Sequence, residues 1–223
     1  MPSYGQFCPV AKAMEILDER WTMLVVRELL EGSTQFNDLR RGVPKMSPAL
    51  LSKRLRTLER HGIVTRTSRG GKVSYTLTES GRELADVVQG IGAWGIRWIS
   101  GMGQQDLDPH LLFWDMRRKV PVDEWPSERT VVAFQLQDVA PKVSRWWLVG
   151  SHGEMDVCDV DPGYDVTATV SGSLRSLIEI WRGDVTWRQA LRTGNVTVAA
   201  PTKIRSVVPS WLGQMPLAAV PRP

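Results

Sequence analysis

The stretch SPALLSKRLRTLERHG, residues 47–62, decides the fold of the first half of this 223-residue chain. It opens with a Ser-Pro pair, which is typical of a helix start. The serine hydroxyl accepts a hydrogen bond from a free backbone N–H, and proline at the first helical position costs the helix no hydrogen bond. Leucines at positions i, i+4 and i+7 predict one buried stripe along a helix over Ala49–His61 that ends at Gly62. The stripe consists of Leu51, Leu55 and Leu58.

The face of this helix opposite the leucines is basic, with Lys53, Arg56 and Arg60. Arginine and lysine side chains reach guanine edges and phosphates, and small residues at a helix start allow its close approach to a groove. We therefore expect the helix to bind duplex DNA in the major groove. The residues expected to contact DNA on it are Ser47, Ala49, Ser52, Lys53, Arg54 and Arg56.

A β-hairpin is predicted directly after this helix. Two β-prone runs, residues 63–68 and 73–77, flank a Gly-Gly pair that suits a tight turn. Arg69 and Lys72 stand on either side of the glycines, so the hairpin tip can reach flanking phosphates or the minor groove. The segment alone favours an ordinary solvated hairpin, but its place after a basic helix favours a DNA-binding wing.

Positive charge is concentrated around these two elements. The whole chain has a formal net charge of +4, yet residues 1–103 sum to +5 and residues 104–223 to −1. Between Arg40 and Lys72 there are ten basic residues and a single acid, Glu59. Such a block is the electrostatic pattern of a polyanion-binding surface. A solvated helix face is the alternative, and the coincidence with the helix and hairpin favours DNA.

Three shorter helices are predicted before the basic helix. The hydrophobic spacing places them over Pro9–Leu17, Trp21–Leu30 and Gln35–Arg41. Ser33 or Thr34 is expected to cap the third of them, since both side chains can accept a hydrogen bond from a free backbone N–H. The first half therefore reads as four helices followed by a hairpin.

A long helix over Glu79–Ser100 is predicted after the hairpin. Its apolar seam repeats at alternating four- and three-residue steps, as in a coiled coil. This spacing predicts pairing with a second copy of the chain, and packing within its own domain is the alternative. The expected dimerisation residues are Leu84, Val88, Ile91, Gly95 and Trp98.

This order of elements and several short motifs resemble the HxlR-type winged helix-turn-helix repressors and activators over about residues 5–100. The resemblance implies a homodimer, a pseudo-palindromic operator in double-stranded DNA, and the basic helix in the major groove. The motifs that carry it are Cys8-Pro9-Val10, Arg20-Trp21-Thr22, Phe36-Asn37-Asp38-Leu39, Leu50 to Gly62, and Tyr75-Thr76-Leu77-Thr78-Glu79-Ser80-Gly81.

Some members of that family sense oxidants or aldehydes through a cysteine near the N-terminus, and Cys8 stands at the matching place. The resemblance therefore implies a redox role for Cys8, which requires an accessible and reactive thiol. The alternative is a small side chain that only packs, as cysteine often does. An additional domain in the second half offers another place for a sensor.

The second half predicts a separate α+β domain. A small, polar and aperiodic stretch at residues 101–106 is expected to be a linker, which gives domains of 1–103 and 107–223. We expect an antiparallel sheet covered by helices. The expected strands are Thr130–Gln137, Arg145–Gly150, Glu154–Asp159, Asp165–Val170 and Asn195–Ala199, and the expected helices are Asp108–Arg118, Leu174–Arg182, Thr186–Arg192 and Thr202–Leu212.

The run from Tyr164 to Gly213 resembles the C-terminal part of the sterol carrier protein-like fold, through Val166 to Gly172, Trp181-Arg182-Gly183-Asp184 and Ala190-Leu191-Arg192-Thr193-Gly194. Proteins of that fold hold apolar molecules in a cavity between sheet and helices, so the resemblance implies a small apolar effector. Aromatic walls are typical of such cavities, and tryptophans that simply fill the core are the alternative. The expected ligand-binding residues are Trp114, Trp146, Trp147, Trp181, Trp187 and Trp211.

Other classes of function find no motif in the sequence. No catalytic motif or cofactor-binding loop is found. The spacing of metal ligands is absent too, because Cys8, Cys158 and the three histidines are scattered along the sequence. No apolar run approaches the roughly 18 residues of a membrane span, and no signal-peptide pattern is visible. We therefore expect a cytoplasmic protein that is not an enzyme, has no cofactor or metal, and does not enter a membrane.

The leading hypothesis is a homodimeric transcriptional regulator whose second domain binds a small apolar ligand. The ligand would shift the dimer between DNA-competent and incompetent states by binding one state better than the other. Two alternatives stay open: a constitutive regulator whose second domain serves only oligomerisation, and a carrier of hydrophobic molecules without regulatory coupling.

Overall fold

The structure is a computed structural model that describes residues 3–99 and 101–223 and divides into two units, Met1–Gly92 and Ala93–Pro223. The division falls within α5 (Glu79–Trp98). Ser100, which the sequence assigned to this helix, lies outside the described residues. The domain limits at 103 and 107 stay a prediction. Over the described ranges, no helix is long and apolar enough to cross a membrane.

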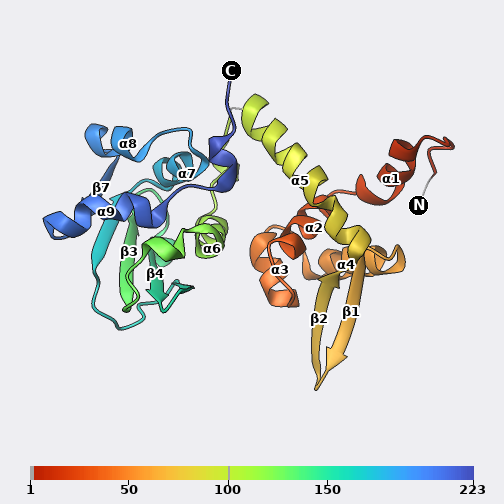
Figure 1. Ribbon diagram of the computed structural model, residues 1–223, viewed down its shortest axis with the longest axis horizontal. Helices are drawn as coiled ribbons and strands as arrows, with labels where there is room; N and C mark the ends of the chain where they lie inside the picture. The colour runs from red at the N-terminus through yellow and green to blue at the C-terminus, as the bar shows by residue number, and fades with distance from the viewer. Residues whose placement is uncertain (1–2, 100) are drawn as a thin grey trace. The chain divides into compact units, whose positions relative to one another are not determined.

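The first unit consists of helices and a two-stranded hairpin that projects beyond them (Figure 1). Residues without solvent exposure, including Val25 and Leu39, form its core with the three leucines of the predicted stripe. The sequence prediction of a buried leucine seam is therefore confirmed. The elements are α1 (Pro9–Leu17), α2 (Thr22–Leu30), α3 (Phe36–Gly42), α4 (Pro48–Arg60), β1 (Val64–Arg69), β2 (Lys72–Leu77) and α5.

Local chemistry explains where these elements begin and turn. The Ser47 hydroxyl accepts a hydrogen bond of 3.3 Å from the Leu50 N–H, so the predicted cap of α4 is confirmed. The hairpin turns at Gly70 and Gly71, whose φ angles of 55° and 78° are both positive. Two successive positive φ angles define the turn that matches the twist of antiparallel strands, and glycine adopts them without steric cost.

The predicted side-chain cap of α3 is wrong. The helix begins at Phe36, and its capping residue is Gln35, which makes no side-chain cap. The preceding segment is instead drawn into the hairpin: the Tyr75 N–H donates to the Thr34 carbonyl at 2.8 Å, and Gln35 pairs with Ser74. Backbone pairing with β2 therefore replaces the side-chain cap that the sequence suggested.

The second unit contains a five-stranded sheet in the order β5-β4-β3-β6-β7. The prediction of a purely antiparallel sheet is wrong, because β3 and β6 run parallel. The strands are β3 (Thr130–Leu136), β4 (Arg145–Ser151), β5 (Glu154–Cys158), β6 (Ala168–Gly172) and β7 (Val196–Ala199).

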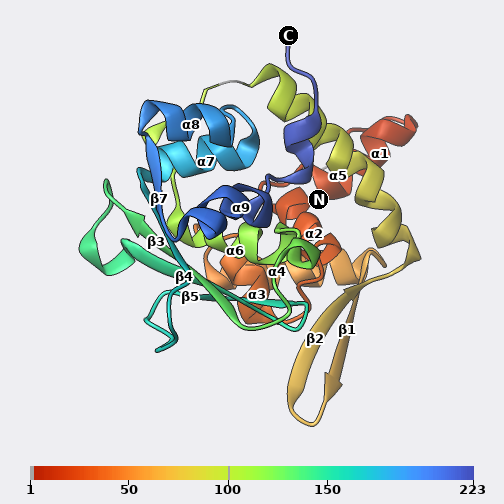
Figure 2. The same ribbon diagram turned by 60° about the vertical axis from the view of Figure 1, so that its left-hand side comes forward.

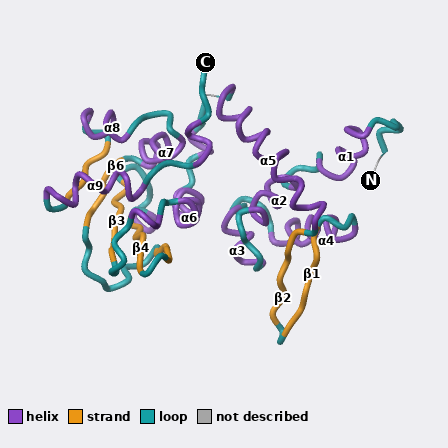
Figure 3. The backbone as a smooth tube through the Cα atoms, in the orientation of Figure 1, coloured by secondary structure: helices purple, strands orange, loops and turns teal. Residues whose placement is uncertain are grey.

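The connection between β5 and β6 explains the mixed sheet. The strands β3, β4 and β5 form an antiparallel meander, so β5 runs in the same direction as β3. Residues 159–167 then return the chain without a helix, and β6 starts beside β3 with the direction of β3 (Figure 3). This return also explains why β6 begins at Ala168, three residues later than the predicted start at Asp165.

Helices cover one face of this sheet (Figures 1 and 2). Alternate strand residues such as Val132, Phe134 and Val170 share a core with Phe113 and Ile180 of the helices. The sequence predicted these helices to within one or two residues at each end. They are α6 (Pro109–Lys119), α7 (Leu174–Arg182), α8 (Trp187–Thr193) and α9 (Thr202–Leu212).

Candidate nucleic-acid interface

The exposed face of α4 carries the basic residues that the sequence predicted there. Ala49, Lys53 and Arg56 are exposed, and their spacing of four and three residues places them on one side of the helix, opposite the leucine seam. Ser47 is exposed at the helix start, and Ser52 is partly buried beside this face. In the part of the chain that the structure describes, neither Lys53 nor Arg56 forms an ion pair, so both charges face solvent.

Arg54 lies apart from this face. Its side chain is buried, with 8% of the residue exposed, and it forms an ion pair with Glu19. Its Nε also donates to the backbone carbonyl of Arg20 at 3.1 Å. Arg54 therefore faces the turn between α1 and α2 instead of solvent, and the candidate interface is built without it.

The tip of the hairpin forms the second part of the candidate interface. Arg69 and Lys72 are paired across the two strands, and both are exposed. Tyr75 and Leu77 of β2 pack against the core of the first unit, which anchors the base of the hairpin. The name wing is used below for β1, β2 and their turn. The wing thus presents two cations at its free end while its base is held by apolar contacts.

A buried charge pair links α2 to the end of α3. Glu28 has no solvent exposure, and its Oε1 accepts a hydrogen bond of 2.8 Å from Arg27 Nη2. The same Nη2 donates to the Gly42 carbonyl at 2.9 Å. A charged pair inside a strongly apolar helix is itself a sign of a specific buried contact, and the sequence predictions did not include this one.

The Glu28 carboxyl group occupies the space beside Gly42 in which a side chain would begin. A Cβ atom built on Gly42 would lie 1.8 Å from Cδ of Glu28, which is far shorter than any van der Waals contact. The contact fixes the end of α3, the helix that precedes the basic helix in the chain.

Apolar side chains lie exposed along α5. Ile91 and Trp98 are 57% and 59% exposed, whereas Leu84 and Val88 pack partly against the core of their own unit. The exposed stripe also contains Val87 and Trp94, which the predicted seam omitted. The exposed residues follow one another at four, three and four residues and so share one side of the helix. The name α5 stripe is used below for Val87, Ile91, Trp94 and Trp98.

A second exposed apolar set lies at the N-terminus of the first unit. Phe7 is almost completely exposed, and Val10 and Met14 of α1 are exposed as well. Cys8 stands directly before α1, is partly buried and forms no disulfide. Its redox role stays a prediction.

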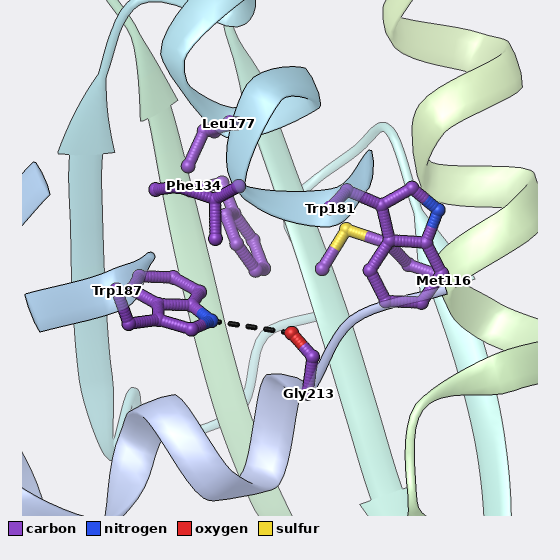
Figure 4. A pocket seen from close by; sticks show the side chains of 7 residues that line it. Met116, Phe134, Leu177, Trp181, Trp187 and Gly213 are labelled. Atoms are coloured by element: carbon purple, nitrogen blue, oxygen red, sulfur yellow. Dashed lines mark hydrogen bonds between the residues drawn. The ribbon is translucent and has the colours of Figure 1, made fainter. Parts of the chain in front are cut away.

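Two of the six predicted ligand-binding tryptophans line a small cavity in the second unit. Trp181 and Trp187 are joined there by Met116 and Phe134 (Figure 4). The Trp187 Nε1 donates to the Gly213 carbonyl at 3.2 Å across it. The cavity volume is about 10 Å³, which holds a single water molecule at most. The other lining residues are Leu177 and Ile180.

The other four predicted tryptophans are buried away from this cavity. Trp146 stacks on Phe113, and its indole N–H donates to the Val143 carbonyl at 2.8 Å. Trp211 stacks on Trp125 and accepts that indole's hydrogen bond on its own carbonyl. Trp114 and Trp147 are buried as well, outside the main apolar core. The stacking contacts of Trp146 and Trp211 agree with the alternative that tryptophans fill the core.

Comparisons with known proteins place the first unit among transcriptional regulators. The family model described as HxlR-like helix-turn-helix matches residues 16–102. The uncharacterized HTH-type transcriptional regulator YvaP of Bacillus subtilis is 37% identical over 99 residues, which cover 43% of this chain and 92% of YvaP. The uncharacterized HTH-type transcriptional regulator sll1512 of Synechocystis is 36% identical over 98 residues, covering 43% of this chain and 73% of the relative.

One solved structure among those found is the reduced form of the transcriptional regulator YodB from B. subtilis. It is 32% identical to this chain and has a TM-score of 0.38, with coverage of 44% of this chain and 100% of YodB. The family match falls in the first part of the chain.

Proposed function

The chain belongs to the HxlR-like helix-turn-helix family of DNA-binding transcriptional regulators, and we propose that it binds a two-part operator as a homodimer. The observation that carries the proposal is the exposed cationic face of α4 next to the cationic tip of the wing. As a member of a regulator family, the protein is not an enzyme. The helix α4 enters the major groove in this proposal, and the wing reaches the flanking backbone or the minor groove.

Substitutions on α4 test this interface. Lys53→Ala and Arg56→Ala are each expected to weaken binding to an operator duplex, selected by the wild-type protein from a random library, by about 1–3 kcal/mol for a bidentate base contact. Arg192→Ala is the matched control, because Arg192 is an exposed cation on α8 and its loss changes the net charge equally. Fluorescence anisotropy at fixed salt measures the affinities. Wild-type affinity in both α4 variants would refute the placement of the interface.

A second copy of the chain is the proposed partner of the α5 stripe. The stripe exposes two tryptophans and two aliphatic side chains to water, which is an unfavourable arrangement for an isolated protomer. Its spacing suits helix pairing across a dimer axis. Phe7, Val10 and Met14 are a second exposed apolar set in the first unit.

Sedimentation equilibrium tests the dimer. Ile91→Asp is expected to convert the protein to monomers, because a carboxylate within the stripe loses its hydration on pairing. Gln89→Asp is the control, since it adds the same charge to an exposed position on another side of α5. Monomeric wild-type protein, or a dimer that tolerates Ile91→Asp, would contradict this assignment.

An apolar effector for the second unit is proposed on the basis of the apolar lining of its cavity. The lining is formed by aromatic and aliphatic side chains. The indole N–H groups of Trp187 and Trp181 already donate to the Gly213 carbonyl and to the Asp115 carboxylate. Ligand sites are usually several hundred Å³ in volume, so a cavity of about 10 Å³ must open before a ligand enters. A ligand that binds only the opened state shifts the protein toward that state.

Titration of 1-anilinonaphthalene-8-sulfonate tests the effector site. The expected result is saturable binding that Trp187→Ala alters, together with a changed operator affinity in the presence of the probe. Saturable binding with unchanged operator affinity would favour a carrier without regulatory coupling. Absence of saturable binding would favour a constitutive regulator whose second domain serves only oligomerisation.

A further inference from the structure

Arg54 occupies an unusual position for a cation on a DNA-binding helix. It lies in sequence between Lys53 and Arg56, both exposed, yet it is one of the few charged residues buried in the first unit. Its guanidinium group makes two contacts, an ion pair with Glu19 and a hydrogen bond of 3.1 Å from Nε to the Arg20 carbonyl. The name α4 clamp is used below for Arg54, Glu19 and the Arg20 carbonyl.

The turn that the clamp grips has a demanding backbone geometry. Trp21 directly follows Arg20 and has a φ of 80°, in the left-handed region that side chains other than glycine rarely adopt. Such a conformation persists only where surrounding contacts hold it. The hydrogen bond from Arg54 is made to the carbonyl of the peptide bond that leads into Trp21. The clamp therefore joins the middle of α4 to a fixed point between α1 and α2.

We propose that Arg54 is a positioning residue, which sets the rotation of α4 about its own axis and thereby aims Lys53 and Arg56 at DNA without touching DNA itself. The leucine seam beneath α4 sets which side of the helix is buried, but it leaves a smaller rotation about the helix axis weakly specified, because apolar contact is non-directional. A buried guanidinium group with two defined partners is directional. This inference rests on the proposed role of α4 in DNA binding.

The small rotation of α4 that base contacts tolerate supports a positioning role for Arg54. Side-chain atoms lie about 6 Å from a helix axis, so a rotation of about 20° moves them by about 2 Å. A bidentate contact to a base has hydrogen bonds of about 3 Å and does not survive such a shift. Contacts to the phosphate backbone by flexible lysine and arginine side chains tolerate it better. Loss of the clamp is therefore expected to reduce specific binding more than non-specific binding.

The experiment compares Arg54→Lys and Glu19→Gln with Lys53→Ala. Arg54→Lys keeps the charge but loses the planar group that binds two partners, and Glu19→Gln keeps a hydrogen-bond acceptor while removing the ion pair. For each variant, anisotropy titrations against the operator and against a scrambled duplex are run at four salt concentrations. Circular dichroism melting fixes a temperature at which every variant is fully folded.

For Arg54→Lys we expect operator affinity to fall by at least about tenfold, which corresponds to 1.4 kcal/mol. Affinity for the scrambled duplex and the salt slope of binding are expected to stay at the wild-type values. Glu19→Gln is expected to show the same pattern with a smaller loss. Lys53→Ala is expected to reduce both affinities and to flatten the salt slope, as loss of a direct contact does.

Two outcomes overturn the inference. A loss of operator affinity in Arg54→Lys with none in Glu19→Gln would make Arg54 a direct DNA contact, because removal of the ion pair leaves the arginine itself in place. Wild-type operator affinity in both folded clamp variants would leave Arg54 with a role in stability alone. Failure of the proposed function is distinguishable from either, because Lys53→Ala and Arg56→Ala would then also bind the operator as the wild type does.

Discussion

Removal of both cations at the tip of the wing gives a quantitative test of the interface. The double variant Arg69→Ala/Lys72→Ala removes two exposed charges from each chain, and therefore four from a dimer on its operator. Each phosphate contact contributes about 0.9 to the slope of log K against log salt, so the four together contribute about 3.6. Between 50 and 200 mM salt, the affinity ratio of wild type to variant should then shrink by about 150-fold.

The assay is a series of anisotropy titrations of one operator duplex from 50 to 200 mM salt. The control double variant Lys142→Ala/Lys203→Ala removes the same charge from exposed positions in the second unit. It separates local contacts from the effect of net charge, which also attracts DNA over longer distances. Parallel salt plots for the wild type and the wing variant would refute a phosphate-binding wing. A slope change of about half the expected size would indicate that two of the four cations contact phosphate.

Further predictions concern the core of the first unit and the cysteine of β5. Leu55→Ala is expected to lower the free energy of unfolding by about 2–5 kcal/mol, whereas Glu59→Ala on the exposed face of α4 should change it by less than about 0.5 kcal/mol, both read from urea unfolding. Gly42→Ala should lower the free energy of unfolding by about 1–3 kcal/mol, because its methyl group meets the buried Glu28 carboxyl group. An unchanged unfolding midpoint would show that this contact is absent. Burial, followed by the charges of Asp156 and Asp159, raises the pKa of the Cys158 thiol. In a Cys8→Ser background, iodoacetamide should therefore modify folded protein more slowly at pH 8 than urea-unfolded protein, and equal rates would contradict the assignment.

Sequence periodicity identified the architecture of the first unit because its strongest signals are local. The Ser-Pro cap, the leucine spacing and the Gly-Gly turn each depend on contacts within a few residues. The cap of α3 was missed because its alternative is not local. The residues before Phe36 pair with β2, about forty positions later in the chain. No pattern within a few residues of Phe36 predicts that pairing.

Helical geometry in the sequence predicts that Arg54 lies beside the leucines, whereas its charge suggested an exposed position. At about 100° per residue, Arg54 lies about 60° from Leu51 and about 40° from Leu58 around the helix, whereas Lys53 lies about 160° from Leu51. Helical geometry alone therefore places Arg54 at the edge of the buried seam. The basic composition of the stretch led to its inclusion with the exposed cations. Its partner Glu19 is 35 positions away, and no local pattern indicates that pairing.

The second unit was predicted less completely for two physical reasons. Alternating hydrophobicity reports that a strand has one buried face, but it does not report strand direction, so the parallel pairing of β3 with β6 was missed. A tryptophan occupies the same buried positions of a hydrophobic sequence pattern whether it fills a core or lines a cavity. Only the packing separates Trp146, which stacks on Phe113, from Trp187, which lies against the cavity.

Two buried contacts of charged side chains, that of Glu28 with Gly42 and that of Arg54 with Glu19, have the same structural effect in the first unit. Apolar burial holds α2, α3 and α4 together, yet it leaves sliding and rotation weakly specified. The Glu28 carboxyl group packs directly against Gly42, and Arg27 joins Glu28 to the Gly42 carbonyl, which fixes how far α3 runs before the chain turns toward α4. The contact of Arg54 with the turn before α2 fixes α4 at its middle. If both contacts act in this way, Gly42→Ala and Arg54→Lys should each reduce discrimination between operator and scrambled DNA in folded protein. Leu55→Ala, which removes only apolar contact, should reduce stability while leaving that discrimination nearly unchanged.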